Sequence, residues 1–316
     1  GIRITNNTFV LATLNGASAA IQATPFIRFN TSTLTWAVDD DRHRDITVTG
    51  NTLLEGYSFL AFRSATNNFK TRRYQISNNT LYNVGGNTTA FPNQANGIWG
   101  QQADSIICTN NLILSDSAHA SGTWLGISLS PLGGSDVIYN NTIRMRKGHT
   151  TSANTFQAIQ ISGSNSSNES RNCDIFIRRN KIRIDSITNA LPLTMFVSFT
   201  GIQATGFYSF NNGTNNTHRV FIDSNDIDSC NMQGSGTFTG FTVQASGNNP
   251  NWSRAFVRAN RITNFRRSTN NGSITGFNVQ LWLDSVEISN NLIQNVVSFP
   301  TTQTANTTSF QPLVLF

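Results

Sequence analysis

A short phrase that recurs nine times restricts the fold of this chain more than any other feature. In most copies two aliphatic residues separated by one position precede an asparagine, and another apolar residue follows two positions after it, as in IRITNNTF at 2–9 and VEISNNLI at 286–293. Repeats of 28 to 45 residues with strand-like content are typical of solenoids. The repeated asparagines are Asn7, Asn51, Asn79, Asn111, Asn141, Asn180, Asn225, Asn260 and Asn291.

Two apolar columns flank the asparagine. Isoleucine, valine or cysteine stands three residues before it, and isoleucine, leucine or phenylalanine stands two residues after it. This alternation predicts half-buried strands that are interrupted at a bend. Asparagine suits the bend because it tolerates the left-handed region and can hydrogen-bond to backbone. We also expect stacked asparagine amides to bond one another along the axis.

A second apolar phrase lies between the copies, at FIRF (26–29), SFLAF (58–62), GIW (97–99), GISL (126–129), AIQI (158–161), GIQA (201–204), GFTV (240–243), GFNV (276–279) and PLVL (312–315). Each turn therefore contains at least two strands at separate corners, which favours parallel stacking. The sequence predicts an all-β protein: a single-stranded parallel β-helix of about nine turns, with asparagine-lined corners, that forms one domain over residues 1–316.

Charged residues test the register of this stack. Arg178, Asp223 and Arg258 occupy one outward position in three successive turns, and Lys181, Asp226 and Arg261 occupy another. If turns stack at about 4.8 Å, each aspartate lies between two cations. Exposed pairs of this kind contribute only a few tenths of a kcal/mol.

The repeated phrase resembles the parallel β-helix repeats of the pectin-lyase-like superfamily, whose helices are right-handed as parallel crossovers nearly always are. The resemblance covers essentially the whole chain. It implies a fold rather than an activity, since the superfamily includes polysaccharide lyases, glycoside hydrolases, phage tailspikes and surface adhesins.

Composition favours a location outside the cytoplasm. Charged residues make up 12% of the chain, and Asn, Thr and Ser are abundant. We expect an extracellular, cell-surface or virion-surface protein without a membrane span, because no apolar run approaches about 18 residues. Cys108 is expected to be a small buried hydrophobe, and a bond between Cys173 and Cys230 remains an open alternative.

The net charge of +6 allows an acidic partner. Arg144, Arg146 and Lys147, together with Arg266 and Arg267, form a candidate positive stripe for acidic glycans. Aromatic residues are not interleaved with these cations, so nucleic acid is not an expected partner.

The ends of the sequence suggest continuation. The chain begins with a second-strand phrase and ends with a first-strand phrase, which together would complete one turn. We expect either flanking sequence or copies joined end to end, because uncapped solenoid ends expose strand edges.

The densest ionisable cluster, Asp39, Asp40, Asp41, Arg42 and His43, provides weak catalytic candidates. Under the resemblance, such residues would act as acid and base on a glycosidic bond, or hold Ca²⁺ against a uronate in a lyase. We interpret the cluster instead as a solvated turn whose charges neutralise one another, because no companion Arg or Lys motif accompanies it. No metal or cofactor is otherwise expected.

Other candidates are aspartates and tryptophans. Asp104, Asp136, Asp174 and Asp284 recur just before the second-strand phrases and could line a groove, although aspartate is common in turns. Trp36, Trp124 and Trp252 are candidate platforms for stacking sugars, whereas Trp99 and Trp282 are expected in the core. His119, His149 and His218 lack metal-ligand spacing.

We therefore expect a structural or adhesive surface rod whose loops and exposed aromatic residues grip glycans or cell-surface polysaccharide. The alternative is a polysaccharide lyase or glycoside hydrolase. A trimeric tailspike would need an outward apolar column along the whole rod, which the sequence analysis does not reveal.

Overall fold

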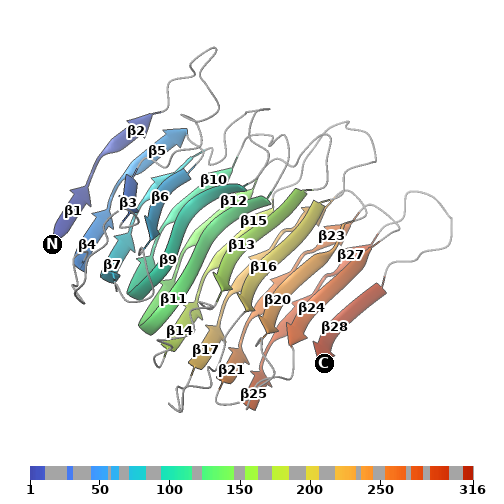
Figure 1. Cartoon of the computed structure of the whole chain (residues 1–316). Helices are drawn as coiled ribbons and strands as arrows, with labels where there is room; N and C mark the ends of the chain where they lie inside the picture. Colours follow the sequence, from blue (N-terminus) through green and yellow to red (C-terminus); the bar gives the residue numbers. More distant parts are fainter. Residues whose placement is uncertain are drawn as a thin grey trace.

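The computed structural model describes residues 1–10, 27–30, 44–55, 58–63, 71–82, 94–115, 123–145, 154–162, 173–184, 197–205, 218–232, 236–244, 253–267, 272–279, 285–298 and 309–315. These residues form strands joined by tight corners, and the strands pair in parallel. The chain is a right-handed parallel β-helix, as the repeat predicts. Figure 1 shows the turns stacked in sequence order, with the two termini at opposite ends of the rod.

The largest sheet has 16 strands and consists of two stacks that share the long strands β9 (Gln94–Thr109) and β11 (Thr123–Tyr139). The first stack, called the first flank, adds β3 (Ile27–Asn30), β6 (Ser58–Arg63), β13 (Asn154–Ser162), β16 (Val197–Thr205), β20 (Phe238–Gln244), β24 (Ser273–Val279) and β28 (Ser309–Leu315). The second flank adds β1 (Ile2–Thr5), β4 (Arg44–Thr49), β7 (Thr71–Ser77), β14 (Cys173–Arg178), β17 (His218–Asp223), β21 (Ser253–Arg258) and β25 (Ser285–Ser289).

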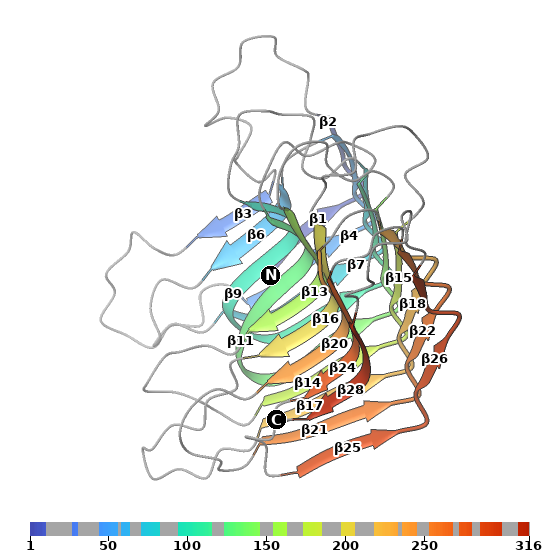
Figure 2. The same ribbon diagram turned by 90° about the vertical axis from the view of Figure 1, so that its right-hand side faces the viewer.

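A nine-stranded sheet, called the third sheet, follows the asparagine corner. It contains β2 (Thr8–Val10), β5 (Thr52–Glu55), β8 (Thr80–Leu81), β10 (Leu112–Ser115), β12 (Thr142–Met145), β15 (Lys181–Ile184), β18 (Asp226–Asp228), β22 (Arg261–Thr263) and β26 (Leu292–Gln294). A three-stranded sheet of β19 (Asn231–Met232), β23 (Arg266–Arg267) and β27 (Val297–Ser298) lies in the C-terminal turns. Figure 2 shows the first flank, second flank and third sheet on different sides of the rod.

The core consists of the apolar columns that the sequence predicts. Ile177, Ile222 and Val257 are fully buried in the second flank, and Ile182 and Ile227 are fully buried in the third sheet. The predicted first-strand phrases fall within strands of the first flank, apart from Phe26, which lies outside the described residues. Since equivalent residues occupy equivalent rungs, the interior is one continuous cluster.

Glycine allows the first flank to approach the third sheet. A Cβ added at Gly201 would lie 2.3 Å from Cδ1 of Ile227 and 2.6 Å from the carbonyl oxygen of Gly240. Gly240 and Gly276 meet the corresponding isoleucines in the next turns. The glycine that opens several first-strand phrases is therefore a packing requirement.

The expectation that the repeated asparagine uses the left-handed region is wrong. The residue before it has the positive φ in every copy, between 54° and 68°, at Asn6, Gly50, Asn78, Asn110, Asn140, Arg179, Ser224, Ala259 and Asn290. This separation has a physical reason: the left-handed residue turns the chain, which frees the following asparagine to direct its amide inward.

The three cysteines are buried thiols, and Cys173 and Cys230 do not form a disulfide. Cys108 lies in an inward column, as predicted, and burial raises the pKa of its thiol to about 12.

Candidate functional site

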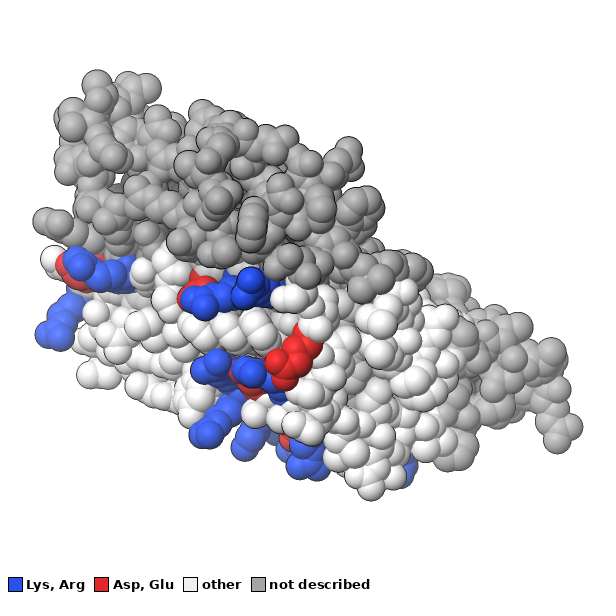
Figure 3. All heavy atoms as spheres, turned by 90° about the horizontal axis from the view of Figure 1, so that it is seen from below, with Lys and Arg blue, Asp and Glu red and all other residues white. Residues whose placement is uncertain are grey.

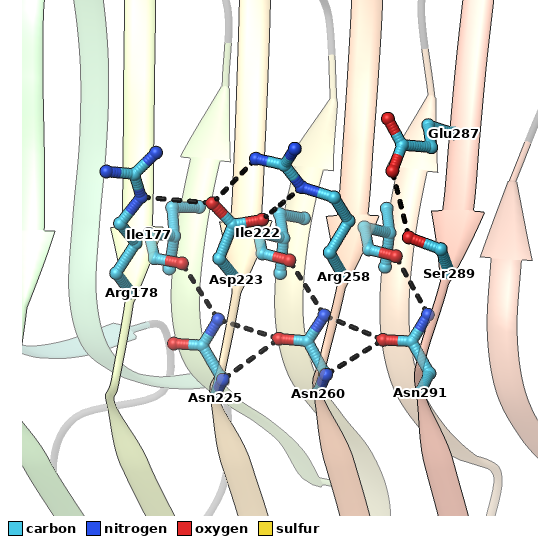
Figure 4. A network of polar contacts seen from close by, with 11 residues as sticks. Ile177, Arg178, Ile222, Asp223, Asn225, Arg258, Asn260, Glu287, Ser289 and Asn291 are labelled. Carbon is cyan, nitrogen blue, oxygen red and sulfur yellow. Dashed lines mark hydrogen bonds and ion pairs between the residues drawn. The ribbon is translucent and has the colours of Figure 1, made fainter.

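The asparagine corner holds the second flank and third sheet in a fixed register. Nδ2 of Asn180 donates to the carbonyl oxygen of Ile138 and to Oδ1 of Asn225, both at 2.9 Å. Oδ1 of Asn180 accepts from the backbone N and Nδ2 of Asn141, both at 3.0 Å. Equivalent bonds link successive asparagines from Asn7 to Asn291, and Figure 4 shows the last three. The predicted amide ladder is confirmed.

An outward apolar column, here called the Phe stripe, runs over five turns of the second flank: Ile107, Val137, Phe176, Phe221 and Phe256. Its phenylalanine rings stack with centroids 4.8 Å and 4.7 Å apart. The three rings and Val137 are half-buried, and Ile107 is 43% exposed. An outward-facing row of stacked apolar side chains is unusual for a solvated β-face, where polar residues normally alternate with core residues.

Two charged rows border the Phe stripe. The corner row is Arg178, Asp223 and Arg258, in which Nε of both arginines donates to the Asp223 carboxylate at 3.0 Å and 3.1 Å (Figure 4). This confirms the first predicted charge ladder. The hydrogen bonds that Arg258 donates to the Asp223 carboxylate raise the pKa of Arg258.

The second row, called the far row, lies on the other side of the Phe stripe and consists of Asp174, Arg219 and Arg254. Nε of Arg219 donates to Oδ1 of Asp174 at 2.7 Å. Figure 3 shows rows of charged side chains separated by uncharged surface on this face.

Guanidinium groups also lie against the stacked rings. Cζ of Arg178 is 4.6 Å from the Phe176 ring centroid, and Cζ of Arg258 is 5.3 Å from that of Phe256. Such contacts contribute about 0.5–1 kcal/mol each at exposed sites. The result is a flat, preordered surface of aromatic edges and arginines.

The second predicted charge ladder is aligned but not bonded. Asp226 pairs in register with Lys181 and Arg261. Its Oδ1 is buried without a hydrogen-bond partner among the described residues. Burial and then repulsion from Asp228 raise the pKa of Asp226, although Arg261, Arg183 and Lys181 oppose the shift.

Asp228 lies two residues further along the same strand, and its pKa is shifted in the opposite direction. Its Oδ1 accepts from Thr263 Oγ1 at 2.9 Å and Asn264 Nδ2 at 2.8 Å, and its Oδ2 accepts from Arg183 and Ser229, both at 2.9 Å. Burial favours the neutral acid, but these hydrogen bonds outweigh it and hold the pKa of Asp228 well below its usual range. Paired carboxylates whose pKa values diverge are typical of acid and base partners.

The first flank presents a different surface. From β11 to β24 its outward positions hold only uncharged residues, mainly hydroxyl and amide side chains. Gln160 and Gln203 are half-buried there, and Ser128 and Thr242 are buried. Ser128 Oγ donates to Gln160 Oε1 at 3.2 Å, so neighbouring turns are linked here too. We call this surface the polar face.

The structure describes only one of the three tryptophans that were predicted to stack on sugars. Trp124 is 3% exposed and stacks on Phe156 at 4.6 Å between centroids, so the prediction that it is a platform is wrong. The first flank places it among inward residues. Trp36 and Trp252 lie outside the described residues, whereas Trp99, expected in the core, is half-buried at an outward position.

Most charged candidates from the sequence lie outside the part of the chain that the structure describes. Asp39, Asp40, Asp41, Arg42 and His43 lie outside the described residues, as do Arg146, Lys147, Asp284, His119, His149 and Trp282. Arg144 is half-buried on β12. Arg267 is 1% exposed, and burial lowers its pKa, so it does not belong to an exposed positive stripe.

The two recurring aspartates whose side chains are described, Asp136 and Asp174, do not share a groove, because they point to opposite sides of the second flank. Asp136 is buried and accepts from the backbone N of Ile106 at 2.7 Å, and Cys173 Sγ lies 3.6 Å from its Oδ2. This carboxylate satisfies a backbone donor where the β9–β11 register shifts. Asp174 instead belongs to the far row.

No cluster of three or more His, Cys, Asp or Glu residues suited to a metal ion occurs in the described part of the chain. Nor do the described residues include a helix of the length and apolarity needed to span a bilayer.

Searches against protein-family models, curated proteins and solved structures found no match for this chain. The functional argument therefore depends on the surfaces described above.

The sequence reasoning missed the Phe stripe. A signal was present, because phenylalanine fills the central position of the repeated phrase in IFI (175–177), VFI (220–222) and AFV (255–257). The repeated phrase leaves the residue between its two apolar positions variable, so the recurrence of phenylalanine there does not stand out.

Proposed function

We propose that this chain is a rigid structural or adhesive rod of an extracellular, cell or virion surface, similar in kind to the non-catalytic members of the pectin-lyase-like superfamily. The observation that carries the proposal is the unbroken asparagine ladder. Because each buried amide is bonded to both neighbouring turns, bending the rod would break several hydrogen bonds at once. Such a body suits the display of a binding surface at a fixed distance and orientation.

We further propose that the rod binds neutral polysaccharide along the polar face. Hydroxyl and amide groups can both donate to and accept from sugar hydroxyls. The absence of charge from the described outward positions between β11 and β24 favours a neutral chain over a uronate polymer. The half-buried Trp99 at an outward position on β9 adds an aromatic group to the same flank.

Co-sedimentation with insoluble cellulose and chitin, and affinity electrophoresis in soluble neutral and acidic polysaccharides, test the binding. We expect retention by a neutral polymer and at least about a tenfold loss in Gln203→Glu. Gln75→Glu is the matched control, because Gln75 is exposed on the second flank and its replacement should leave binding unchanged. Equal binding by both variants would contradict the location, and no retention by any polymer would contradict glycan adhesion.

The alternative function is a polysaccharide lyase or glycoside hydrolase. The observation that favours it is the pair Asp226 and Asp228, whose pKa values diverge on one strand. Under this alternative Asp226 holds a proton as general acid, and Asp228 stays ionised. Assays for new reducing ends and for unsaturated products, with and without Ca²⁺, distinguish the two functions.

Turnover that is lost in both Asp226→Asn and Asp228→Asn would support the enzyme at this pair. Turnover lost only in Asp40→Ala or Asp41→Ala would instead locate catalysis in the acidic cluster that precedes β4. Binding without turnover supports the rod.

A further inference from the structure

The Phe stripe and its charged rows have the composition of a protein interface. Aromatic residues and arginine are enriched at interface centres, and a polar rim surrounds them. Here half-buried rings form the centre, and ion-paired arginines and aspartates lie on both sides. An outward apolar column of this kind favours association when it is exposed.

The signs of the bordering charges form a checkerboard on β14 and β17. On β14 the corner row is positive at Arg178 and the far row is negative at Asp174. On β17 the signs are reversed, at Asp223 and Arg219. These two neighbouring turns thus carry opposite charges in both rows.

This checkerboard is complementary to itself. Consider a twofold axis parallel to the strands that passes between β14 and β17 in the plane of contact. The rotation reverses the order of turns and places Arg178 opposite Asp223 of the second copy, and Asp174 opposite Arg219 of the second copy. An isologous contact of this kind satisfies each charge twice, once within each rod and once across the interface.

The same rotation pairs the apolar centre without a clash of charge. Phe176 lies opposite Phe221 of the second copy, and Phe256 lies opposite Val137 of the second copy. The arginines of β21, Arg254 and Arg258, then lie opposite Ser135 and Tyr139 of the second copy, which are uncharged positions on β11. No like charges oppose each other across these four turns.

We propose that two copies of this chain associate side by side and antiparallel through the Phe stripe. This goes beyond the proposed function, because it arranges rods laterally whatever they bind. A polyanionic glycan fits less well, since both rows contain aspartates that would repel it. Joining of copies end to end would use other surfaces and would produce chains of copies instead of a closed dimer.

Sedimentation velocity of the full chain over about 1–300 μM, a range that covers weak to moderate affinities, measures the association. We expect a monomer–dimer equilibrium, with the dissociation constant raised at least about tenfold by Phe221→Glu. Gln160→Glu on the polar face is the matched control and should leave the constant unchanged. Thermal unfolding followed by circular dichroism establishes that each variant is folded.

A charge-swap pair tests the proposed register. Asp174→Arg should weaken the dimer, because it opposes Arg219 of the second copy with a like charge. The double variant Asp174→Arg/Arg219→Asp should restore it, since the swapped signs are again opposite and Asp at 219 would lie between two arginines within each rod.

A wild-type chain that remains monomeric throughout this range would overturn the proposal. A dimer or filament that Phe221→Glu does not weaken would also overturn it, because association would then use another surface. Failure of the double variant to restore the dimer would contradict the antiparallel register.

Discussion

The buried asparagine ladder and the exposed corner row run side by side over the same turns, yet they contribute in different ways. Both place equivalent side chains in successive turns, and in both, hydrogen bonds join neighbouring side chains (Figure 4). Asn180, Asn225 and Asn260 are 0% exposed, whereas the side chains of Arg178 and Arg258 are 39% and 36% exposed. Water can replace the bonds of the row but not those of the ladder.

This difference shows that regular stacking alone does not determine how much a row of side chains contributes to the free energy of unfolding. A buried donor or acceptor that loses its partner costs about 1–3 kcal/mol, whereas an exposed ion pair contributes about 0–1 kcal/mol. The ladder therefore stabilises the rod, and the row is free to serve recognition. Five variants, described from the largest expected effect to the smallest, test this division.

Asn180→Ala should produce the largest loss. The substitution leaves the Asn141 amide without its acceptor and the Ile138 carbonyl oxygen without its donor. We expect the free energy of unfolding to fall by about 3–5 kcal/mol, measured by urea denaturation with circular dichroism.

The adjacent, exposed Arg179→Ala is the control, because Ala259 already occupies the equivalent left-handed position. It should cost less than about 1 kcal/mol. Equal losses in the two variants would contradict the dominance of the buried ladder.

Gly201→Val should cost about 2–3 kcal/mol, because its side chain would overlap Ile227 and the Gly240 carbonyl oxygen inside the rod. Thr200→Val, one residue earlier on the polar face, is the control and should change stability by no more than about 0.5 kcal/mol. Unfolding midpoints in urea provide the comparison. A tolerated valine at 201 would show that the interior is less closely packed than the structure indicates.

Asp228→Asn should cost about 1–2 kcal/mol at neutral pH, because the ionised carboxylate accepts four hydrogen bonds. Its pKa is lower in the folded chain than in the unfolded chain, so its contribution is present above the unfolded value of about 3.9 and is lost as pH falls through the folded value.

Asp226→Asn should have the opposite sign at neutral pH. Since folding raises the pKa of Asp226, its ionised form disfavours folding above that pKa, and removing the charge should stabilise the rod. Unfolding measured between about pH 3 and pH 8 should therefore separate the two variants. Destabilisation by Asp226→Asn at neutral pH would argue that Lys181 and Arg261 compensate its burial.

Asp223→Asn should have the smallest effect on stability, a few tenths of a kcal/mol, although it removes the central charge of the corner row. The difference from wild type should disappear in about 1 M salt, where the screening length is about 3 Å. A loss as large as that of Asn180→Ala would mean that the row, too, is structural. Under the proposed dimer, the same substitution should weaken association more than folding.

Much of the architecture could be predicted from the sequence because the repeat encodes backbone periodicity. The alternation around Asn180 or Asn225 fixes which residues face inward, and equal offsets in successive copies fix the register. The predicted pairings of Arg178 with Asp223 and of Lys181 with Asp226 are both present as strand register.

Side-chain contacts were decided by the tertiary structure. Asp223 is bonded to both neighbouring arginines, but Asp226, equally well aligned, is bonded to neither neighbouring cation among the described residues. Strand register sets the spacing between α-carbons, but a contact between two long side chains also depends on the direction in which each one points. Other partners matter as well: Arg183, for example, donates a hydrogen bond to Asp228.

The sequence by itself determined a stacked parallel coil with asparagine at its corner. The alternation of apolar residues and the residue type at the turn are local properties, and they recur in every repeat. Only the tertiary structure decided that the residue before each asparagine makes the turn, that Trp124 is buried, and that three phenylalanines align on the outer surface. These features depend on what the neighbouring turns place beside a residue, and no single copy of the repeat contains that information.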